Sequence, residues 1–298
     1  MANETKLTLA VVFLARGRDG GLAAVNRFFE TYQQFEPGLE HKLYILAKGW
    51  DQPNEFATLK KISDLNRSVL VELPDDGYDW GAYFRCIDKI NENLVCFLNT
   101  HSQIRANFWL KYLTRPFFDN ANVGIVGATA SYQSIAPSYR LILPHVYEVY
   151  RQRGLRRAIL NFVFRLAIYA RRLYYVIFFP GFPNPHVRSN AFVTHKLLFK
   201  SYQTGKSIPQ TKIETYALES GRNSFTRFIL AQNMRALTVN SDGMAFDLSE
   251  WPHSHTYTRS PLKYLVADNQ TCYYESHSPG RRRHLELDVW GQIYTEPL

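Results

Sequence analysis

Short apolar runs alternate with segments of helical periodicity over the first 130 residues of the chain. Each run has the length of a buried strand, and each intervening segment is long enough for a helix. This pattern predicts βαβ units, and so an α/β fold with a mostly parallel sheet flanked by helices. The expected strands are Leu7–Leu14, Lys42–Ala47, Val69–Leu73, Leu94–Leu98 and Val123–Val126, and the expected helices are 22–35, 55–65, 79–91 and 107–117.

Polar residues follow the first four expected strands. Ligands of parallel sheets bind at the carboxyl ends of the strands, so these residues are the first candidates for a functional site. The turn at Arg16–Gly21 matches neither GxGxxG nor a Walker loop, which argues against a dinucleotide site or a P-loop. The candidates are Arg16-Gly17, Lys48-Gly49-Trp50, Asp75-Asp76 and Asn99-Thr100-His101-Ser102.

The composition limits the classes of protein to consider. Of 298 residues, 46% are hydrophobic and 20% are charged, which excludes a disordered or collagen-like chain. A net charge of +9 indicates an anionic partner, such as nucleic acid, a membrane surface or a phosphorylated substrate. The three cysteines match no zinc or redox spacing, so we expect a reducing compartment and no disulfide framework.

An arginine-rich segment, residues 155–179, lies within an expected insertion at 145–181. At 100° per residue, Leu155, Ile159 and Leu166 share one helical face, and arginines mixed with further apolar residues occupy the other. This mixture favours a helix lying in a membrane interface. The alternative is a helix packed on the core on one face and on a loop on the other. No run reaches the ~20 apolar residues of a membrane span, and Leu7–Leu14 is read as a strand rather than a signal peptide.

Polar clusters occur at two places: in the loop after the fourth expected strand, and at the start of the expected helix 79–91, which precedes that strand. If strand geometry continues past Leu98, Asn99 and His101 point to the same side, and His101 is a potential metal ligand. The alternative is a strand-end turn whose side chains satisfy backbone groups. Asp79 is placed to cap a helix start, where Gly81 would let a phosphate approach closely. The alternative there is a plain turn with a capping residue.

The C-terminal half offers a candidate base and candidate cations. We expect a strand at 191–194, a helical stretch at 211–228 around a glycine, and a late strand at 237–240. Glu219 could act as general base on a sugar hydroxyl, and Arg222 or Arg227 could hold a diphosphate. The alternative is a capping Ser220 with Glu219 paired to an arginine.

Two loop histidines, His253 and His255, have a spacing that suits metal binding, and packing explains them equally well.

The order of these motifs resembles glycosyltransferases of the GT-A fold, of the family 2 type and the rhamnan-synthesis-like bacterial type. The resemblance covers most of the chain outside the arginine-rich segment. It implies a donor-nucleotide loop, an acid that contacts the base, a glycine-containing helix start, and an acceptor-side strand. These correspond to Ala15-Arg16-Gly17, to Asp75 or Asp76, to Asp79-Trp80-Gly81, and to the segment with Asn190. Asn99-Thr100-His101 replaces the D-x-D or D-x-H element, and Ser102 extends the match to the rhamnan-synthesis-like enzymes.

The resemblance implies a single catalytic domain over residues 1–298 that moves a sugar from a nucleotide-sugar donor to a glycan or lipid-linked acceptor in cell-surface polysaccharide synthesis. It implies Glu219 as the catalytic base, with an inverting single displacement. A divalent cation, Mg²⁺ or Mn²⁺, is left open because the carboxylates of D-x-D are absent. The expected location is cytoplasmic and peripheral on the membrane face.

Two other functions remain open. One is a non-catalytic member of this fold that binds a sugar nucleotide or glycan, which the missing D-x-D favours. The other is a basic nucleic-acid-binding protein, which the charge permits. No helix-turn-helix, RRM, KH or zinc pattern is present, so this second alternative is the weaker one.

Overall fold

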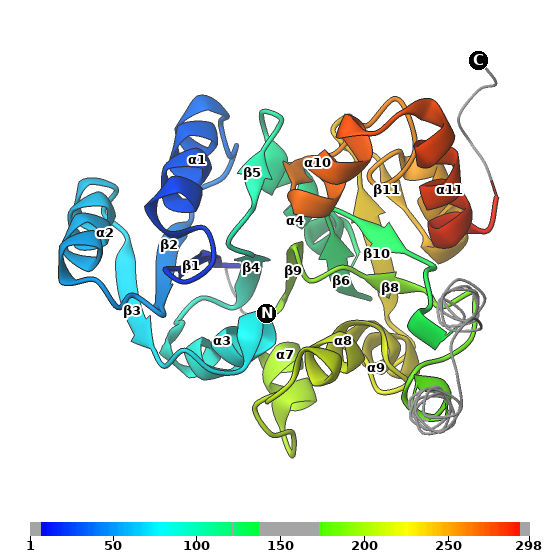
Figure 1. The fold of residues 1–298 in the computed structure, drawn as a ribbon, viewed down its shortest axis with the longest axis horizontal. Coiled ribbons are helices and arrows are strands. Elements are labelled where there is room, and N and C mark those ends of the chain that lie inside the picture. The colour runs from blue at the N-terminus through cyan, green and yellow to red at the C-terminus, as the bar shows by residue number, and fades with distance from the viewer. Residues whose placement is uncertain (1–6, 121, 137–172, 174, 293–298) are drawn as a thin grey trace, which may run out of the picture.

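An eight-stranded mixed sheet forms the centre of the molecule (Figure 1). The computed structural model describes residues 7–120, 122–136, 173 and 175–292. The strand order is β11-β10-β6-β9-β4-β1-β2-β3. The bounds are β1 Leu9–Arg16, β2 Lys42–Lys48, β3 Val69–Leu73, β4 Leu94–Leu98, β6 Val123–Gly127, β9 Ala191–His195, β10 Arg235–Val239 and β11 Ala245–Phe246.

Most neighbouring strands of this sheet are parallel. β1 pairs in parallel with β2 and β4, β2 with β3, and β6 with β10. β9 is antiparallel to both β4 and β6, and β11 is antiparallel to β10. The fold is therefore α/β with a mostly parallel sheet, as the sequence predicts. Short pairs lie outside it: β5 Gln103–Ile104 with β12 Val266–Ala267, and β7 Ala130–Ser131 with β8 His186–Val187.

Helices cover both faces of the sheet because the strands are apolar on both sides. On β1, Val11 and Phe13 face one hydrophobic cluster, and Val12 and Leu14 face the other. The first cluster includes residues of α1 Gly21–Gln34, α2 Pro53–Leu65 and α4 Trp109–Asp119. The second includes residues of α3 Tyr78–Cys86, α7 Lys196–Gln203, α9 Phe225–Ala231 and α11 Pro279–Trp290. Further helices among the described residues are α8 Lys212–Ser220, α10 Asn269–Ser276, and the 3₁₀ segments η1 Ile87–Lys89 and η2 Leu248–Ser254.

Local pattern predicted most of these bounds to within two residues, with two differences. The helix expected at 79–91 ends at Cys86 and continues as the short η1. The helical stretch expected at 211–228 is two helices, because α8 ends at Ser220 and its C-cap Gly221 is extended. The prediction missed this break because periodicity does not show where a backbone leaves the helical region.

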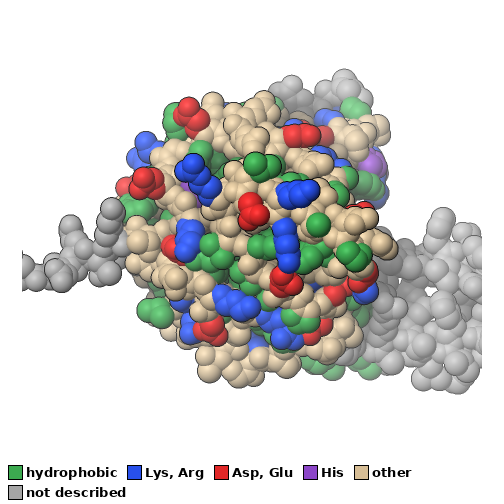
Figure 2. All heavy atoms as spheres, turned by 90° about the vertical axis from the view of Figure 1, so that its left-hand side faces the viewer, with side chains coloured by type: hydrophobic (Ala, Val, Ile, Leu, Met, Phe, Trp, Pro, Cys, Tyr) green, Lys and Arg blue, Asp and Glu red, His purple; other side chains and the backbone are tan. Residues whose placement is uncertain are grey.

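The arginine-rich segment lies largely outside the described residues; of 155–179, the structure describes 173 and 175–179. Among the residues that it describes, no helix is long and apolar enough to cross a membrane. On the face shown in Figure 2, lysines and arginines are interspersed with acids. Exposed ion pairs also occur in the chain, for example between Lys60 Nζ and Glu72 Oε1, which are 3.4 Å apart. No basic stripe of the kind expected for nucleic acid is visible on that face.

Candidate functional site

A cleft of about 130 Å³ opens where β1 and β4 end and α3 begins. These are the carboxyl ends of parallel strands, where the sequence places the candidates. The cleft brings together one cation, two acids and a histidine from segments far apart in the chain. Its lining residues are Leu14, Arg16, Asp19, Tyr78, Asp79, Asn99, Thr100 and His101.

Two arginines, Arg16 at the end of β1 and Arg18 just after it, converge on Asp75, which follows β3. Arg16 Nε donates to Asp75 Oδ1 at 3.1 Å, and Arg18 Nη1 donates to Asp75 Oδ2 at 3.2 Å. Arg18 also binds Asp51 through Nε at 2.6 Å. The turn between the arginines must be glycine, because a Cβ on Gly17 would lie 2.4 Å from the Gly49 carbonyl oxygen. The chain is thus drawn tightly across the ends of β1 and β2.

Lys48, at the end of β2, anchors the loop that leads into α3. Its side chain is buried, and Nζ donates to the carbonyls of Asp76 and Tyr78 at 2.5 Å each. Burial lowers the pKa of Lys48 to about 8, and the neighbouring Arg16 acts in the same direction. The residues that this lysine fixes immediately precede Asp79, so Lys48 sets the position of that carboxyl group.

The element that replaces D-x-D is a turn. β4 ends at Leu98, so strand alternation does not carry Asn99 and His101 to one side as expected. Asn99 Oδ1 accepts from His101 N and Ser102 Oγ, both at 3.1 Å. His101 Nε2 lies 3.1 Å from Asp19 Oδ1. The structure thus supports the turn alternative for Asn99 and Ser102, while His101 lines the cleft.

The donor set does not fit a divalent cation. The Asn99 amide oxygen already accepts two hydrogen bonds. His253 Nδ1 lies 3.1 Å from Arg259 Nη1, and His255 Nδ1 lies 3.1 Å from the Pro261 carbonyl. Across the described residues, no three His, Cys, Asp or Glu side chains come together as a metal site would need. The predicted ligands His101, His253 and His255 are not brought together.

A serine joins two carboxyl groups beside the cleft. Ser189 lies between β8 and β9, and its Oγ is 2.9 Å from Asp79 Oδ2. The same oxygen makes a short hydrogen bond to Glu219 Oε2, which also accepts from Ser189 N at 3.0 Å. Asp79 Oδ1 accepts from Trp80 N at 2.9 Å, while the helix N-cap is Gly77 rather than Asp79. Glu219 lies in the last turn of α8, not at a helix entry as expected.

The surroundings of Asp79 and of the nearby His186 favour their uncharged forms. Burial raises the pKa of Asp79, and the charge of Glu219 raises it further. His186 is buried, with Nδ1 2.8 Å from the Asn184 carbonyl and Nε2 3.9 Å from Glu219 Oε1. Burial lowers the pKa of His186, although Glu219 opposes the shift. The result is a partly buried pair of acids with a buried histidine at its side.

Buried contacts hold the segment that carries Ser189. Arg188 Nη2 donates to Asp268 Oδ2 at 2.9 Å, and its guanidinium lies 4.2 Å from the centre of the Tyr257 ring. Both members of this ion pair are buried. Asn190 connects the segment to the cleft, because its carbonyl accepts from Asn99 N at 2.9 Å and from Ser102 Oγ at 3.1 Å. Its side-chain Oδ1 accepts from Thr129 Oγ1 at 2.8 Å.

Several predicted site residues lie elsewhere. Trp80 is buried in the second cluster and stacks on Phe192 and Phe199, because the first turn of α3 directs its ring into the core. A Cβ on Gly81 would lie 3.1 Å from Ile208 Cγ2 and 3.2 Å from the Asp76 carbonyl oxygen, so Gly81 faces other parts of the chain and not open space for a phosphate. Asp76 pairs with Arg85 at 2.5 Å, and the Ala15 carbonyl accepts from Trp50 Nε1 at 2.9 Å. These four residues support the site without lining it.

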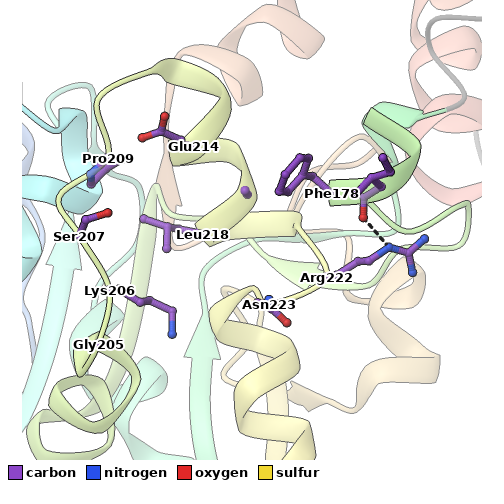
Figure 3. A pocket seen from close by; sticks show the side chains of 11 residues that line it. Phe178, Gly205, Lys206, Ser207, Pro209, Glu214, Leu218, Arg222 and Asn223 are labelled. Atoms are coloured by element: carbon purple, nitrogen blue, oxygen red, sulfur yellow. Dashed lines mark hydrogen bonds between the residues drawn. The ribbon is translucent and has the colours of Figure 1, made fainter. Parts of the chain in front are cut away.

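The two predicted diphosphate cations are not in the cleft either. Arg222 donates through Nε to the Ile177 carbonyl at 2.8 Å and through Nη2 to the Val176 carbonyl at 3.1 Å. It borders a separate cavity of about 550 Å³ beside α8, with Phe178, Lys206 and Leu218 (Figure 3). Arg227 donates to Asn184 Oδ1 at 3.2 Å. Among the described residues, Arg16 lines the cleft and Arg18 lies beside it. The sequence predicted Arg16 as a site residue but not Arg18.

The site also contains residues that sequence reasoning missed. Ser189 and His186 lie in a proline-rich stretch with no catalytic spacing, and Asp19 and Asp51 lie in ordinary turn sequences. Asp19 and Asp51 have one sequence signal, their position shortly after β1 and β2, and Ser189 and His186 have none. Contacts across the sheet, and not local pattern, identify them.

The chain matches no protein-family model and no curated protein. Among solved structures it is similar to glucosyl-3-phosphoglycerate synthase from Mycobacterium tuberculosis, at 14% identity and a TM-score of 0.36. That alignment covers 65% of this chain and 57% of the synthase, so the chain spans little more than half of it. It is also similar to CMP:2-keto-3-deoxy-manno-octonic acid synthetase, at 9% identity, a TM-score of 0.43, and coverage of 78% of this chain and 88% of that one. GalNAc-T7 aligns over 42% of this chain and 23% of its own, at 14% identity and a TM-score of 0.34.

At such identities the likeness concerns the fold alone, and no residue role transfers from these enzymes. The chain is similar in structure, at low identity, to enzymes of the GT-A and nucleotidyltransferase fold.

Proposed function

We propose that this protein is a glycosyltransferase that moves a sugar from a nucleotide-sugar donor to a hydroxyl group of an acceptor. One observation carries the proposal. Asp79 lines the cleft at the strand ends and is hydrogen-bonded to Ser189, which in turn binds Glu219. A candidate base therefore lies two hydrogen bonds from a cleft that holds Arg16 and His101.

The cleft suits the diphosphate part of the donor. Arginine forms charge-assisted hydrogen bonds with phosphate oxygens, and Arg16 and Arg18 stand at its edge. At about 130 Å³ it is smaller than the ~300–1,000 Å³ of sites that enclose a whole small molecule. The nucleoside would therefore extend over the rim formed by Gly17, Gly49 and Asp75.

The reaction is a single displacement. The acceptor hydroxyl oxygen forms a bond to the anomeric carbon while the bond from that carbon to the diphosphate oxygen breaks. Glu219 takes the hydroxyl proton, as a carboxylate within hydrogen-bond reach can. The leaving nucleoside diphosphate gains negative charge, which Arg16 and His101 stabilise. No step is routed through a metal, because the donor set does not fit one.

Binding and turnover test this proposal separately. A thermal-shift panel of UDP-, GDP-, dTDP- and CMP-sugars, each with Mn²⁺ and with EDTA, should show a rise in melting temperature with one nucleotide family. We expect that rise to survive EDTA. With the donor chosen, Glu219→Gln should keep the shift and lose at least 100-fold in transfer rate, in line with general-base catalysis. Glu72→Gln, at the surface pair with Lys60, is the control. Full transfer by a folded Glu219→Gln would refute the assignment.

A non-catalytic sugar-nucleotide binder is the second candidate. The observation that favours it is the Asn99 turn, where both hydrogen bonds to Oδ1 serve the backbone and Ser102. The same panel, followed by transfer assays, distinguishes a binder from a transferase. A thermal shift with one donor and no transfer to glycan or lipid-linked acceptors would establish binding alone.

The acceptor and location rest on the arginine-rich segment. We propose a glycan or lipid-linked acceptor of cell-surface polysaccharide synthesis, reached by an enzyme that is cytoplasmic and peripheral on the membrane through residues 155–179. Co-sedimentation with vesicles of anionic phospholipid tests this. Arg156, Arg157 and Arg165 changed to Glu should abolish pelleting, while Arg115→Glu on α4 should not. Equal pelleting of both variants would refute the membrane role.

A further inference from the structure

The Ser189 hydroxyl contacts more carboxyl oxygens than it can donate to. It has a single hydrogen, yet its Oγ lies within hydrogen-bond distance of both Asp79 Oδ2 and Glu219 Oε2. If both acids were ionised, one contact would place two oxygen lone pairs against each other in a shielded site. A second proton removes this conflict, since a protonated carboxyl can donate to the serine oxygen.

The remaining contacts show which acid carries that proton. Glu219 Oε2 accepts two hydrogen bonds, from Ser189 N at 3.0 Å and from its Oγ. A carboxyl oxygen that accepts two hydrogen bonds has no lone pair left for a proton. Asp79 Oδ1 accepts from Trp80 N, and its Oδ2 faces only the serine hydroxyl among these contacts. Asp79 Oδ2 is thus the oxygen placed to donate.

We propose that Asp79, Ser189 and Glu219 form one hydrogen-bonded relay whose two carboxyl groups carry one proton between them, with Asp79 as the protonated acid and Glu219 as the carboxylate. Asp79 donates to Ser189 Oγ, and Ser189 donates to Glu219. Burial, which raises the pKa of Asp79, acts in the same direction. The catalytic meaning of the relay rests on the proposed transferase activity, but the shared proton does not.

The relay has two consequences for the site. A neutral Asp79 removes a negative charge from the cleft in which a phosphate would bind, so an acid can line it without repelling the donor. Ser189 acts as a positioning residue, because its two hydrogen bonds to Oε2 orient the Glu219 carboxylate and leave Oε1 to accept the proton. Other titratable or charged groups act on the pair from neighbouring elements: Lys48, Tyr83, His186, Arg188 and Tyr257. Arg227 acts on His186.

Infrared spectroscopy of the full chain without ligand tests the shared proton. At pH 7 we expect the carbonyl stretch of a protonated carboxylic acid in the wild-type protein. Asp79→Asn should remove it, and should fold, because the Asn amide can donate to Ser189 as the acid does. Asp119→Asn, at an exposed pair with Arg115, should keep it. The absence of the band, or its loss in Glu219→Gln rather than in Asp79→Asn, would overturn the assignment.

A second variant covers the case in which Asp79→Asn does not fold. Glu219→Gln removes the charge that opposes ionisation of Asp79, so the acid band should titrate at a lower pH than in the wild type. An unchanged midpoint would show that the two carboxyls are not coupled, and the relay would be wrong.

Kinetics test the role of Ser189 once a donor is known. Ser189→Ala should lower kcat and leave the KM of the donor nearly unchanged, because the Glu219 carboxylate loses a hydrogen bond that orients it. Ser189→Thr keeps the hydroxyl and should restore the wild-type kcat. Identical kcat values for Ala and wild type would refute the positioning role. The acid band can be measured in a protein that has no transfer activity. The shared proton and the transferase activity are therefore tested independently.

Discussion

Arg16 is the residue whose substitution best separates donor binding from folding. It lines the cleft, its side chain is partly exposed (26%), and Arg18 still donates to Asp75 when Arg16 is replaced. A hydrogen bond to a charged group contributes about 1.5–3 kcal/mol. We expect Arg16→Ala to weaken nucleotide-sugar binding by about 10- to 100-fold in calorimetric titration. Arg115→Ala on α4 is the control, and equal affinities in the two variants would show that the cleft does not bind the diphosphate.

His186 predicts a pH dependence of stability. Its folded pKa lies below the ordinary 6.5, because burial disfavours the imidazolium more than Glu219 favours it. As the pH falls through 6.5, the unfolded chain takes up the proton first, so stability present above 6.5 is lost until the folded pKa is passed. The melting temperature of His186→Gln should fall less between pH 7 and 5 than that of the wild type. His284→Gln, exposed on α11, should follow the wild type, and parallel curves for all three would contradict the prediction.

At the scale of elements, the segment 186–190 is held by α10. Asp268 accepts from Gln270 N and Thr271 N at the start of α10 and also binds Arg188. Breaking a buried ion pair leaves a charge without its partner, at a cost of about 3–5 kcal/mol. We expect Asp268→Asn to destabilise the protein by roughly that amount in urea unfolding.

The matched control is Asp242→Asn, which breaks the exposed pair with Lys263 at 2.7 Å. Exposed pairs contribute about 0–1 kcal/mol. If the two variants lost equal stability, the Arg188–Asp268 pair would not be what holds Ser189 in place.

The elements were more predictable than the site they position. β3 and β4 have the predicted bounds, because apolar runs of strand length are a local signal. Asp75 and His101 were predicted for the same reason, as residues that follow strands. Trp80 was predicted to lie beside the donor, but it lies in the core. Its direction depends on the geometry of the first turn of α3, which the pattern of apolar residues does not predict. Ser189 carries no local signal at all.

At the scale of the whole molecule, the sheet joins the two halves of the chain. β9, from the C-terminal half, lies between β4 and β6 from the N-terminal half and pairs with both. Neither half can complete the sheet by itself. We therefore expect one unfolding transition, with the near- and far-ultraviolet circular dichroism curves coincident in urea. Two separated transitions would show two independent units and contradict the expectation of a single domain over 1–298.

The sequence by itself determined the strands, the helices and the edge of the sheet where a ligand would bind, because hydrophobic periodicity and strand-end polarity act over a few residues. Only the tertiary structure decided which residues meet there. Asp79 and Ser189 are 110 positions apart, and Ser189 and Glu219 are 30 apart. The antiparallel β9 brings them together, and such long-range pairing depends on how whole faces pack rather than on any local pattern of residues.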